Sequence, residues 1–251
     1  MISVNVSRDG VCEIVIDNPP VNAFSIALLK RLALEAEKAG ANPEVKCVLL
    51  RASGRGFSAG GDVKEVEALE GFEGILGQAE WSLKASLALI DCPVPVIGAV
   101  QGYCIGVGVL IAASADILIA AKHTRFVLAE VDNGATTGAV HALKLMPEKR
   151  ARAAMMMAEP IYAEELHGYG SVLRTVPLSE FENEAWSVAA VIARKPRAAM
   201  TRLKESFNNS SKAQDLRQLY RAELAYTLEL NMMGLASEGR KGFIDRRRDG
   251  Y

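Results

Sequence analysis

Apolar positions in the first 130 residues fall into short runs with the spacing of β-strands. The chain begins with alternating apolar and polar residues up to a turn at Asp9 and Gly10, which is typical of one arm of a hairpin. Val45–Leu50 and Val94–Val100 are instead continuous apolar runs, as expected for strands that are covered on both faces. The pattern therefore predicts a mostly buried sheet. Its other strands are expected at residues 11–16, 116–120, 125–128 and 172–176.

Helical spacing separates these runs and dominates the chain after residue 140. A helix is expected to begin after Ser25, a favourable N-cap residue, because the apolar residues that follow recur at helical spacing. This repeated order of strand and helix indicates an α/β fold. A change of composition near Pro196 divides the fold into a core of residues 1–195 and a helical C-terminal region of residues 196–251. The later helices are predicted at residues 72–88, 150–157, 178–193 and 215–230.

Composition and charge narrow the classes of function. Half of the 251 residues are hydrophobic, which is enough for a sizeable core, and the formal net charge is −1. This balance gives no broad attraction to nucleic acid or to an anionic membrane surface. The longest apolar stretch, Val94–Val100, is too short to span a bilayer. We therefore expect a cytoplasmic protein with no nucleic-acid partner and no membrane partner.

The cysteines and histidines lack the spacing of metal ligands. There is no C-x-x-C pair, and no cysteine lies beside a histidine, so we expect reduced and mostly buried thiols. No metal and no redox cofactor is indicated. The residues concerned are Cys12, Cys47, Cys92 and Cys104, with His123, His141 and His167.

Two glycine-bearing loops carry the strongest chemical signal in the chain. They cover residues 54–62 and 102–108, and each follows an apolar, strand-like run and leads into a helix-like one. Glycine lets the backbone approach a ligand closely and direct free N–H groups at it. Two such loops could hold one oxygen that gains negative charge, as in an oxyanion hole. The pattern predicts an enzyme that stabilises an enolate.

The residues of these loops resemble the enoyl-CoA hydratase/isomerase (crotonase) superfamily. The resemblance is specific at residues 57–65, 93–103 and 114–120, and it extends from Pro20 to Phe243. It implies a spiral of repeated ββα units in residues 1–195, holding an acyl-CoA site, followed by a helical trimerisation region. It also implies an acyl-CoA thioester as substrate, with coenzyme A as part of that substrate. The expected assembly is a homotrimer or a hexamer formed by two trimers.

The resemblance assigns roles to individual residues. The backbone amides of Gly61 and Val107 would form the oxyanion hole for the thioester oxygen, and Glu130 would be the acid/base carboxylate. The family's other carboxylate position falls on Leu110, which cannot move a proton. Asp132 could restore a second acid if its side chain faces the cavity.

The missing carboxylate leaves several reactions open. Double-bond isomerisation and ring-opening hydrolysis, each with a single glutamate, are favoured over simple hydration. The alternatives are a 2-enoyl-CoA hydratase that uses Asp132, and a non-catalytic protein of this fold that binds CoA or RNA or acts as a scaffold. Residues 70–72, 170–172 and 229–231 look closest to ring-opening acyl-CoA hydrolases of sterol degradation.

The same resemblance gives the expected contacts with CoA and the acyl group. Most of them are backbone segments around the two loops, and the last two are an aromatic and a basic residue near the C-terminus. They are Val21, Asn22, Ala23, Ala59, Gly60, Gly61, Asp62, Val63, Tyr103, Gly106, Phe243 and Arg246.

Overall fold

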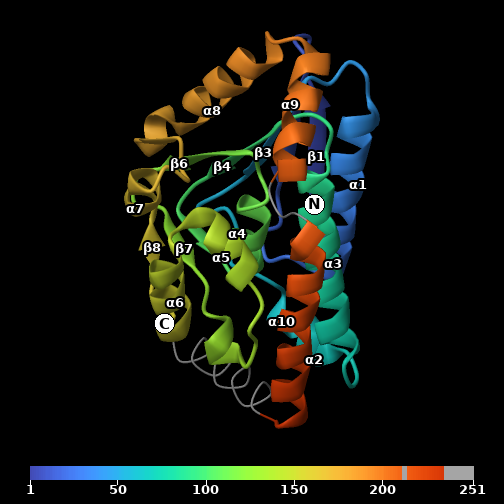
Figure 1. The fold of residues 1–251 in the computed structure, drawn as a ribbon, viewed down its shortest axis with the longest axis vertical. Helices are drawn as coiled ribbons and strands as arrows, with labels where there is room; N and C mark the ends of the chain where they lie inside the picture. The colour runs from blue at the N-terminus through green and yellow to red at the C-terminus, as the bar shows by residue number, and fades with distance from the viewer. Residues whose placement is uncertain (211–213, 235–251) are drawn as a thin grey trace.

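The computed structural model describes residues 1–210 and 214–234, which form two β-sheets surrounded by helices (Figure 1). The larger sheet has the order β1-β2-β3-β4-β6-β9, and the smaller sheet has the order β5-β7-β8. The strands are β1 (Ile2–Val6), β2 (Val11–Ile16), β3 (Cys47–Ala52), β4 (Val96–Val100), β5 (Tyr103–Ile105), β6 (Ile117–Ala121), β7 (Arg125–Val127), β8 (Ile161–Tyr162) and β9 (Arg174–Val176).

The helices follow the strands in alternation and then take over the second half of the chain. They are α1 (Ile26–Ala41), α2 (Val63–Ala68), α3 (Glu73–Ile90), α4 (Val107–Ala112), α5 (Ala139–Leu145), α6 (Glu148–Met157), α7 (Ala163–Gly168), α8 (Leu178–Ala193), α9 (Arg197–Ser210) and α10 (Gln214–Met232), with a 3₁₀ turn η1 (Glu130–Asn133). Ser25 caps α1 as predicted, because its side chain accepts a hydrogen bond from the Leu28 amide.

The larger sheet is covered on both faces, which explains its continuous apolar strands. Val48 and Leu50 of β3 belong to the hydrophobic cluster that contains residues of α1, α3 and α4. Cys47 and Leu49 point the opposite way, into the cluster that contains α8. Successive side chains of a strand alternate between faces, so a strand covered on both faces is buried along its length, and in β3 only Arg51 is half-buried. In the larger sheet, neighbouring strands are parallel from β2 through β3, β4 and β6 to β9.

Two details differ from the sequence-based expectation. β4 begins at Val96 instead of Val94, because Pro95 has no N–H to donate to a neighbouring strand. The next amide, that of Val96, donates to the Asp116 carboxylate at 2.7 Å and not to a strand. The sequence does not predict β5, which lies inside the glycine-bearing loop of residues 102–108, or β8, whose two residues are too few to show a period. All four cysteines are buried and free, as predicted.

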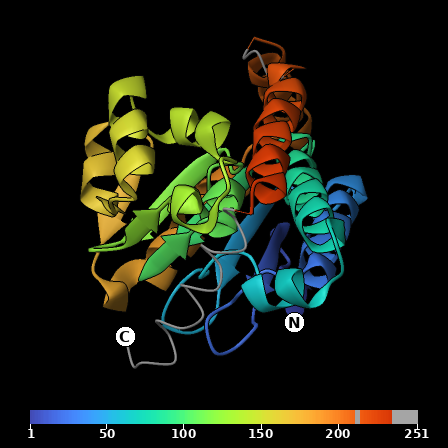
Figure 2. The same cartoon turned by 90° about the horizontal axis from the view of Figure 1, so that it is seen from below.

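The C-terminal helices pack against the core. Lys204 of α9 is buried and donates to the Leu89 and Val94 carbonyls while its ammonium lies 2.7 Å from the Asp116 carboxylate. α10 runs beside α3 in both ribbon views (Figures 1 and 2). The predicted boundary at residue 195 falls between α8 and α9 and stays a prediction as a domain boundary. Across the two described ranges, every helix is too short or too polar to traverse a lipid bilayer.

Candidate active site

The two glycine-bearing loops lie side by side beyond the ends of β3 and β4. The Ile105 amide donates to the Ser58 carbonyl at 2.9 Å, and the Ser58 amide donates to the Tyr103 carbonyl at 3.2 Å. At Gly60, φ is +100°, and an added Cβ would lie 3.2 Å from the Ile105 carbonyl oxygen. Glycine at this position therefore allows the close contact between the loops.

Each loop contributes to the same cavity one residue whose backbone amide is not used within the fold. Phe24 pairs with the first loop by donating to the Gly60 carbonyl and accepting from the Asp62 amide, so the Gly61 amide between them points away from that strand pairing. Val107 is the first residue of α4, where an amide has no acceptor within the helix. Neither amide has a hydrogen-bond acceptor among the described residues. Both residues line a cavity of about 510 Å³.

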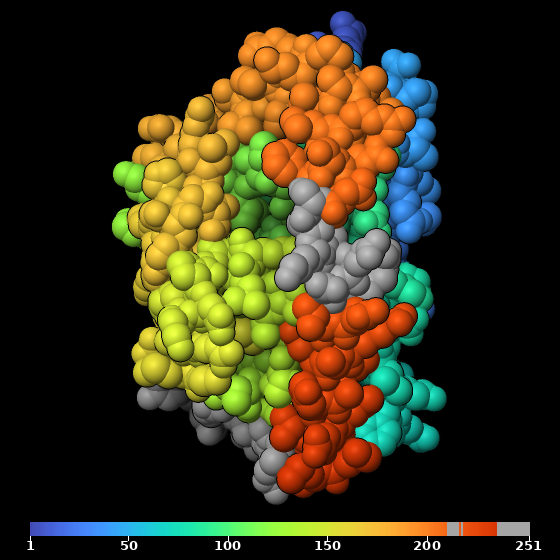
Figure 3. Space-filling view, in the orientation of Figure 1, coloured from blue at the N-terminus to red at the C-terminus, as the bar shows by residue number. Residues whose placement is uncertain are grey.

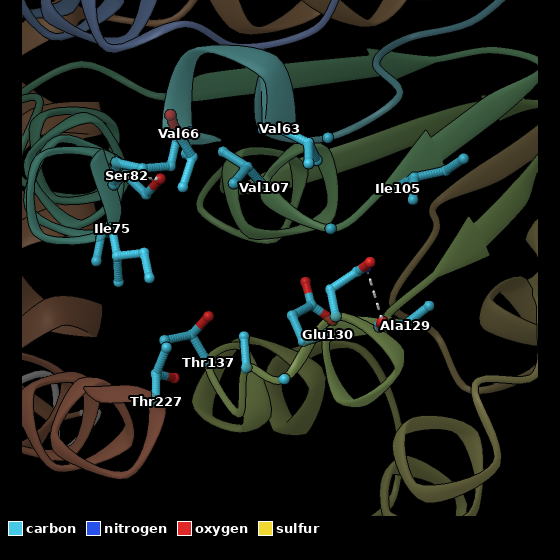
Figure 4. Close-up of a pocket in the computed structure, with 18 of the residues that line it drawn as sticks. Val63, Val66, Ile75, Ser82, Ile105, Val107, Ala129, Glu130, Thr137 and Thr227 are labelled. Carbon is cyan, nitrogen blue, oxygen red and sulfur yellow. Dashed lines mark hydrogen bonds between the residues drawn. The ribbon is translucent and has the colours of Figure 1, made fainter. Parts of the chain in front are cut away.

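The carboxyl group of Glu130 lies against the second loop. The Gly106 amide donates to the Val127 carbonyl at 2.8 Å, which joins this loop to the strand that leads into Glu130. A Cβ added at Gly106 would lie 3.2 Å from Glu130 Oε1. In Figure 4, Glu130 lies below the same open space that Val63 and Val107 border from above. The carboxyl group and the two amides thus share one cavity.

Burial changes the proton affinity of Glu130. Its Oε2 is buried and has no hydrogen-bond partner among the described residues. Burial raises the pKa of Glu130 to about 8, the negative charge of Glu223 adds to the increase, and a hydrogen bond with its own backbone opposes it. A carboxyl group with this pKa can accept or release a proton near neutral pH.

The structure places no carboxylate at the second position expected from the family. Leu110 of α4 is buried, and one of its methyl carbons lies 3.4 Å from where a Cβ on Gly138 would be. Asp132 lies on the exposed side of η1, but it lines the same cavity as Glu130. Within the described ranges, no three His, Cys, Asp or Glu side chains are close enough to hold a metal ion.

Five predicted contact residues line the cavity, whereas others form hydrogen bonds that hold the loops and the helix after them. Asn22 is buried, and its side-chain amide donates to the carbonyls of Ser53 (2.8 Å) and Gly56 (3.0 Å). Asp62 caps α2 by accepting from the Lys64 and Glu65 amides. The cavity-lining residues are Ala59, Gly60, Gly61, Val63 and Gly106.

The remaining predicted contacts lie outside this cavity or outside the described residues. The Tyr103 ring packs over Gly56, where an added Cβ would lie 2.4 Å from a ring carbon. The Val21 carbonyl accepts from the Ala59 amide at 3.0 Å, and Ala23 follows in the same segment. Phe243 and Arg246 are not among the described residues.

Sequence reasoning missed the contribution of α10. The Glu223 carboxylate accepts hydrogen bonds from the Gly138 amide (2.9 Å) and from the Val140 amide (3.0 Å). It thus gives an acceptor to two amides at the start of α5 that have none within the helix. Thr227 accepts from the Thr136 amide at 3.0 Å. Figure 3 shows α10 lying along the surface of the residues that follow Glu130. α10 therefore holds the segment that follows Glu130, part of which lines the cavity.

The fold and the site define the class of this protein. The chain belongs to the enoyl-CoA hydratase/isomerase family, whose sequence profile matches residues 7–251. It is therefore an enzyme of the crotonase superfamily, as the loop residues predicted, and the fold-class prediction is confirmed as well.

Particular relatives cover almost the whole chain. The chain is similar to the (7aS)-7a-methyl-1,5-dioxo-2,3,5,6,7,7a-hexahydro-1H-indene-carboxyl-CoA hydrolases of Rhodococcus jostii and Mycobacterium tuberculosis. The first is 36% identical over 97% of this chain and 94% of the relative, and the second is 35% identical over 98% and 99%. The crystal structure of an enoyl-CoA hydratase from Mycobacterium avium subsp. paratuberculosis matches with a TM-score of 0.86 and 28% identity, covering 98% of this chain and 96% of that chain.

Proposed function

We propose that this protein is a CoA-thioester hydrolase that opens a carbocyclic ring by cleaving a carbon–carbon bond. One observation carries the proposal: Glu130, whose Oε2 is buried, lines one cavity with Gly61 and Val107, whose amides have no acceptor among the described residues, while Leu110 occupies the second carboxylate position. The names of the two relatives support a hydrolase and an acyl-CoA substrate with a bicyclic dioxo acyl group. The substrate would carry a ring ketone in the β position to the thioester carbonyl.

The two amides would stabilise the negative charge that develops on the thioester oxygen. When the ring bond breaks, its electron pair moves to the α carbon and is shared with the thioester oxygen as an enolate. The Gly61 and Val107 N–H groups have no acceptor within residues 1–210 and 214–234, and each could donate to that oxygen. Each donor of this kind contributes about 3 kcal/mol to a transition state, because it is already oriented and shielded from water.

Glu130 would move the one proton that the reaction requires. The ionised carboxylate removes a proton from water as the water oxygen bonds to the ring ketone carbon. The bond from that carbon to the α carbon then breaks, and Glu130 returns the proton to the α carbon. The product has gained one water as a new carboxylic acid, and its thioester remains intact. No second carboxylate is needed for this sequence of steps.

Double-bond isomerisation remains the second candidate, because the same single carboxylate could remove a proton and return it to a nearby carbon. Simple hydration would need Asp132 as a second acid, and its exposed position on η1 favours it less.

The proposal extends to binding and assembly. The segment Val21–Ala23 and the first loop would contact the CoA part through their backbone, with Phe243 and Arg246 supplied by a neighbouring subunit. We infer a homotrimer or a dimer of trimers in the cytoplasm, where the four free cysteines stay reduced. Light scattering of the purified protein measures the assembly directly.

Turnover of three thioesters tests the reaction: a 2-enoyl-CoA, a 3-enoyl-CoA and a cyclic β-diketone CoA thioester, each followed by mass spectrometry. The proposal predicts that only the diketone gains water and that Glu130→Gln abolishes the gain. Glu148→Gln, which changes an exposed carboxylate on α6, is the matched control and keeps turnover. An isobaric shift of the 3-enoyl thioester would favour isomerisation, and water gain by the 2-enoyl thioester would favour hydration through Asp132.

A further inference from the structure

The segment that carries Glu130 is bordered by a cavity on each side. Besides the main cavity, a second cavity of about 330 Å³ lies against this segment, and Glu130 and Ala135 line both. Asn133, Gly134 and Thr137 line only the main cavity, whereas Val131, Thr136 and Ala139 line only the second. We refer to residues 130–139 as the base segment. Because close packing does not support it on both sides, its position depends on hydrogen bonds with other elements.

α10 supplies hydrogen bonds to the middle and to the end of the base segment. The Thr136 amide donates to Thr227 Oγ1 at 3.0 Å, and the Thr136 hydroxyl donates to the Glu223 carbonyl at 3.0 Å. The Glu223 carboxylate accepts from the Gly138 and Val140 amides. Glu223 and Thr227 are themselves buried, so these hydrogen bonds are shielded from water. α10 thus anchors the base segment from the C-terminal region.

This anchor is connected to Glu130 through the backbone. The Ala135 amide donates to the Glu130 carbonyl at 2.9 Å, so the residue before Thr136 is bonded to Glu130 itself. On the other side, the Gly106 amide donates to the Val127 carbonyl at 2.8 Å and holds the chain before Glu130 against the second loop. Glu130 therefore lies between two fixed points, one at the second loop and one at α10.

The arrangement gives α10 a part in the reaction. We propose that α10, through Glu223 and Thr227, positions the Glu130 carboxyl group relative to the two loop amides. Both are positioning residues, because they act on the reaction through the base segment. The inference rests on the proposed function and makes the C-terminal region part of the active site. A displacement of about 1 Å can cost up to about a hundredfold in rate, so loss of either anchor affects kcat more than binding.

Glu223 has an electrostatic effect that Thr227 does not share. Its negative charge raises the pKa of Glu130, in addition to the larger effect of burial. The other titratable or charged side chains that line the two cavities with Glu130 are Asp132 of η1, Tyr220 of α10, and Glu148 and Arg152 of α6. Removing the charge of Glu223 therefore lowers the pKa of Glu130, whereas removing the Thr227 hydroxyl leaves every charge in place.

Two substitutions in α10 separate the anchor from the charge. Glu223→Gln removes the charge and leaves one acceptor oxygen for two amides, whereas Thr227→Val removes only the acceptor of the Thr136 amide. Both are expected to lower the plateau kcat for a cyclic β-diketone CoA thioester by about ten- to a hundredfold, with little change in KM. Only Glu223→Gln is expected to move the midpoint of the pH profile of kcat/KM to lower pH.

A matched control removes a different carboxylate next to the base segment. Glu148→Gln changes an exposed side chain that lines the second cavity, and it is expected to keep the wild-type kcat and midpoint. A wild-type kcat in either α10 variant overturns the proposal, and so does a reduced kcat in Glu223→Gln with an unmoved midpoint. If Glu223→Gln does not fold, Thr227→Val decides: a reduced kcat with the wild-type KM and midpoint supports the anchor, and a wild-type kcat overturns it.

A measurement without turnover distinguishes failure of this inference from failure of ring opening. Because glutamine at position 130 cannot ionise, the gain in Tm from Glu130→Gln should increase between pH 6 and pH 9. This increase should be smaller in the Glu223→Gln background, where the pKa of Glu130 is lower. If the diketone is not turned over, ring opening fails. A smaller increase then still supports the coupling between Glu223 and Glu130, and an equal increase overturns it.

Discussion

Replacing Glu130 with glutamine should remove activity and at the same time stabilise the folded protein in alkaline solution. The pKa of Glu130 rises from 4.5 to about 8 on folding, chiefly because the carboxyl group is buried. A raised pKa means that the group's contribution to stability is fully present below pH 4.5 and is lost as pH increases through 8. Glutamine has nearly the same shape and cannot ionise, so Glu130→Gln escapes this loss.

The magnitude follows from the shift. At about 1.4 kcal/mol for each pKa unit, the raised pKa lowers the free energy of unfolding by about 2 kcal/mol at pH 6, where the folded protein keeps the group protonated, and by about 5 kcal/mol at pH 9, where the group is ionised. The stability advantage of Glu130→Gln should therefore grow by about 3 kcal/mol between these pH values. For a chain of this length, that corresponds to an additional rise of roughly 6–12 °C in Tm.

Thermal unfolding at pH 6 and pH 9 measures this difference, with protein concentration held constant because assembly also affects Tm. Activity follows from the same group: kcat of the wild type should rise with pH to a plateau above about 8, since the ionised carboxylate is the base. Glu148→Gln, whose side chain is 60% exposed in the wild type, should show no growing advantage. A Glu130→Gln advantage that is absent or independent of pH would refute the burial of this carboxyl group.

Three further substitutions test other parts of the structure. Burial lowers the pKa of His141 from 6.5 to about 3, so stability is lost as pH falls below 6.5. As the pH falls from 7.5 to 4.5, the free energy of unfolding of His141→Leu should increase by about 3 kcal/mol relative to that of the wild type, as measured by urea unfolding at both pH values. Lys204→Met should lower the free energy of unfolding by about 1–3 kcal/mol, because the Leu89 and Val94 carbonyls lose the buried ammonium that donates to them; an unchanged free energy of unfolding in urea would contradict this. Gly106→Ala places a Cβ 3.2 Å from Glu130 Oε1 at a φ of +51°, and should reduce kcat more than tenfold while CoA binding by calorimetry is retained; unchanged kcat would contradict the close contact.

The loops and the candidate base could be predicted because their signals are local. Glycine-bearing turns after apolar strands are visible within residues 54–62 and 102–108, and Glu130 lies shortly after the short strand Arg125–Val127, with two residues between them. The roles of these residues came from the family resemblance, because the periodicity of strands and helices predicts structure and not chemistry.

The contribution of α10 could not be located from the sequence, because its partners lie more than 80 residues away along the chain. The helix did carry a partial signal. Leu216, Tyr220, Glu223 and Thr227 recur at helical spacing and are all buried, so two polar residues lie on a face that otherwise packs into the protein. A polar residue on such a face needs a hydrogen-bonding partner, but its identity depends on the tertiary fold.

The measurement that tests the central claim most directly is the mass of the product formed from a cyclic β-diketone CoA thioester in H₂¹⁸O. Ring opening by Glu130 and the two loop amides predicts a product that keeps its CoA, gains one molecule of labelled water, and carries the label in the new carboxyl group. Release of free CoA with the label in the former thioester carboxyl group would contradict the account, because the attack would then have occurred at the carbonyl that the amides are proposed to hold as an enolate.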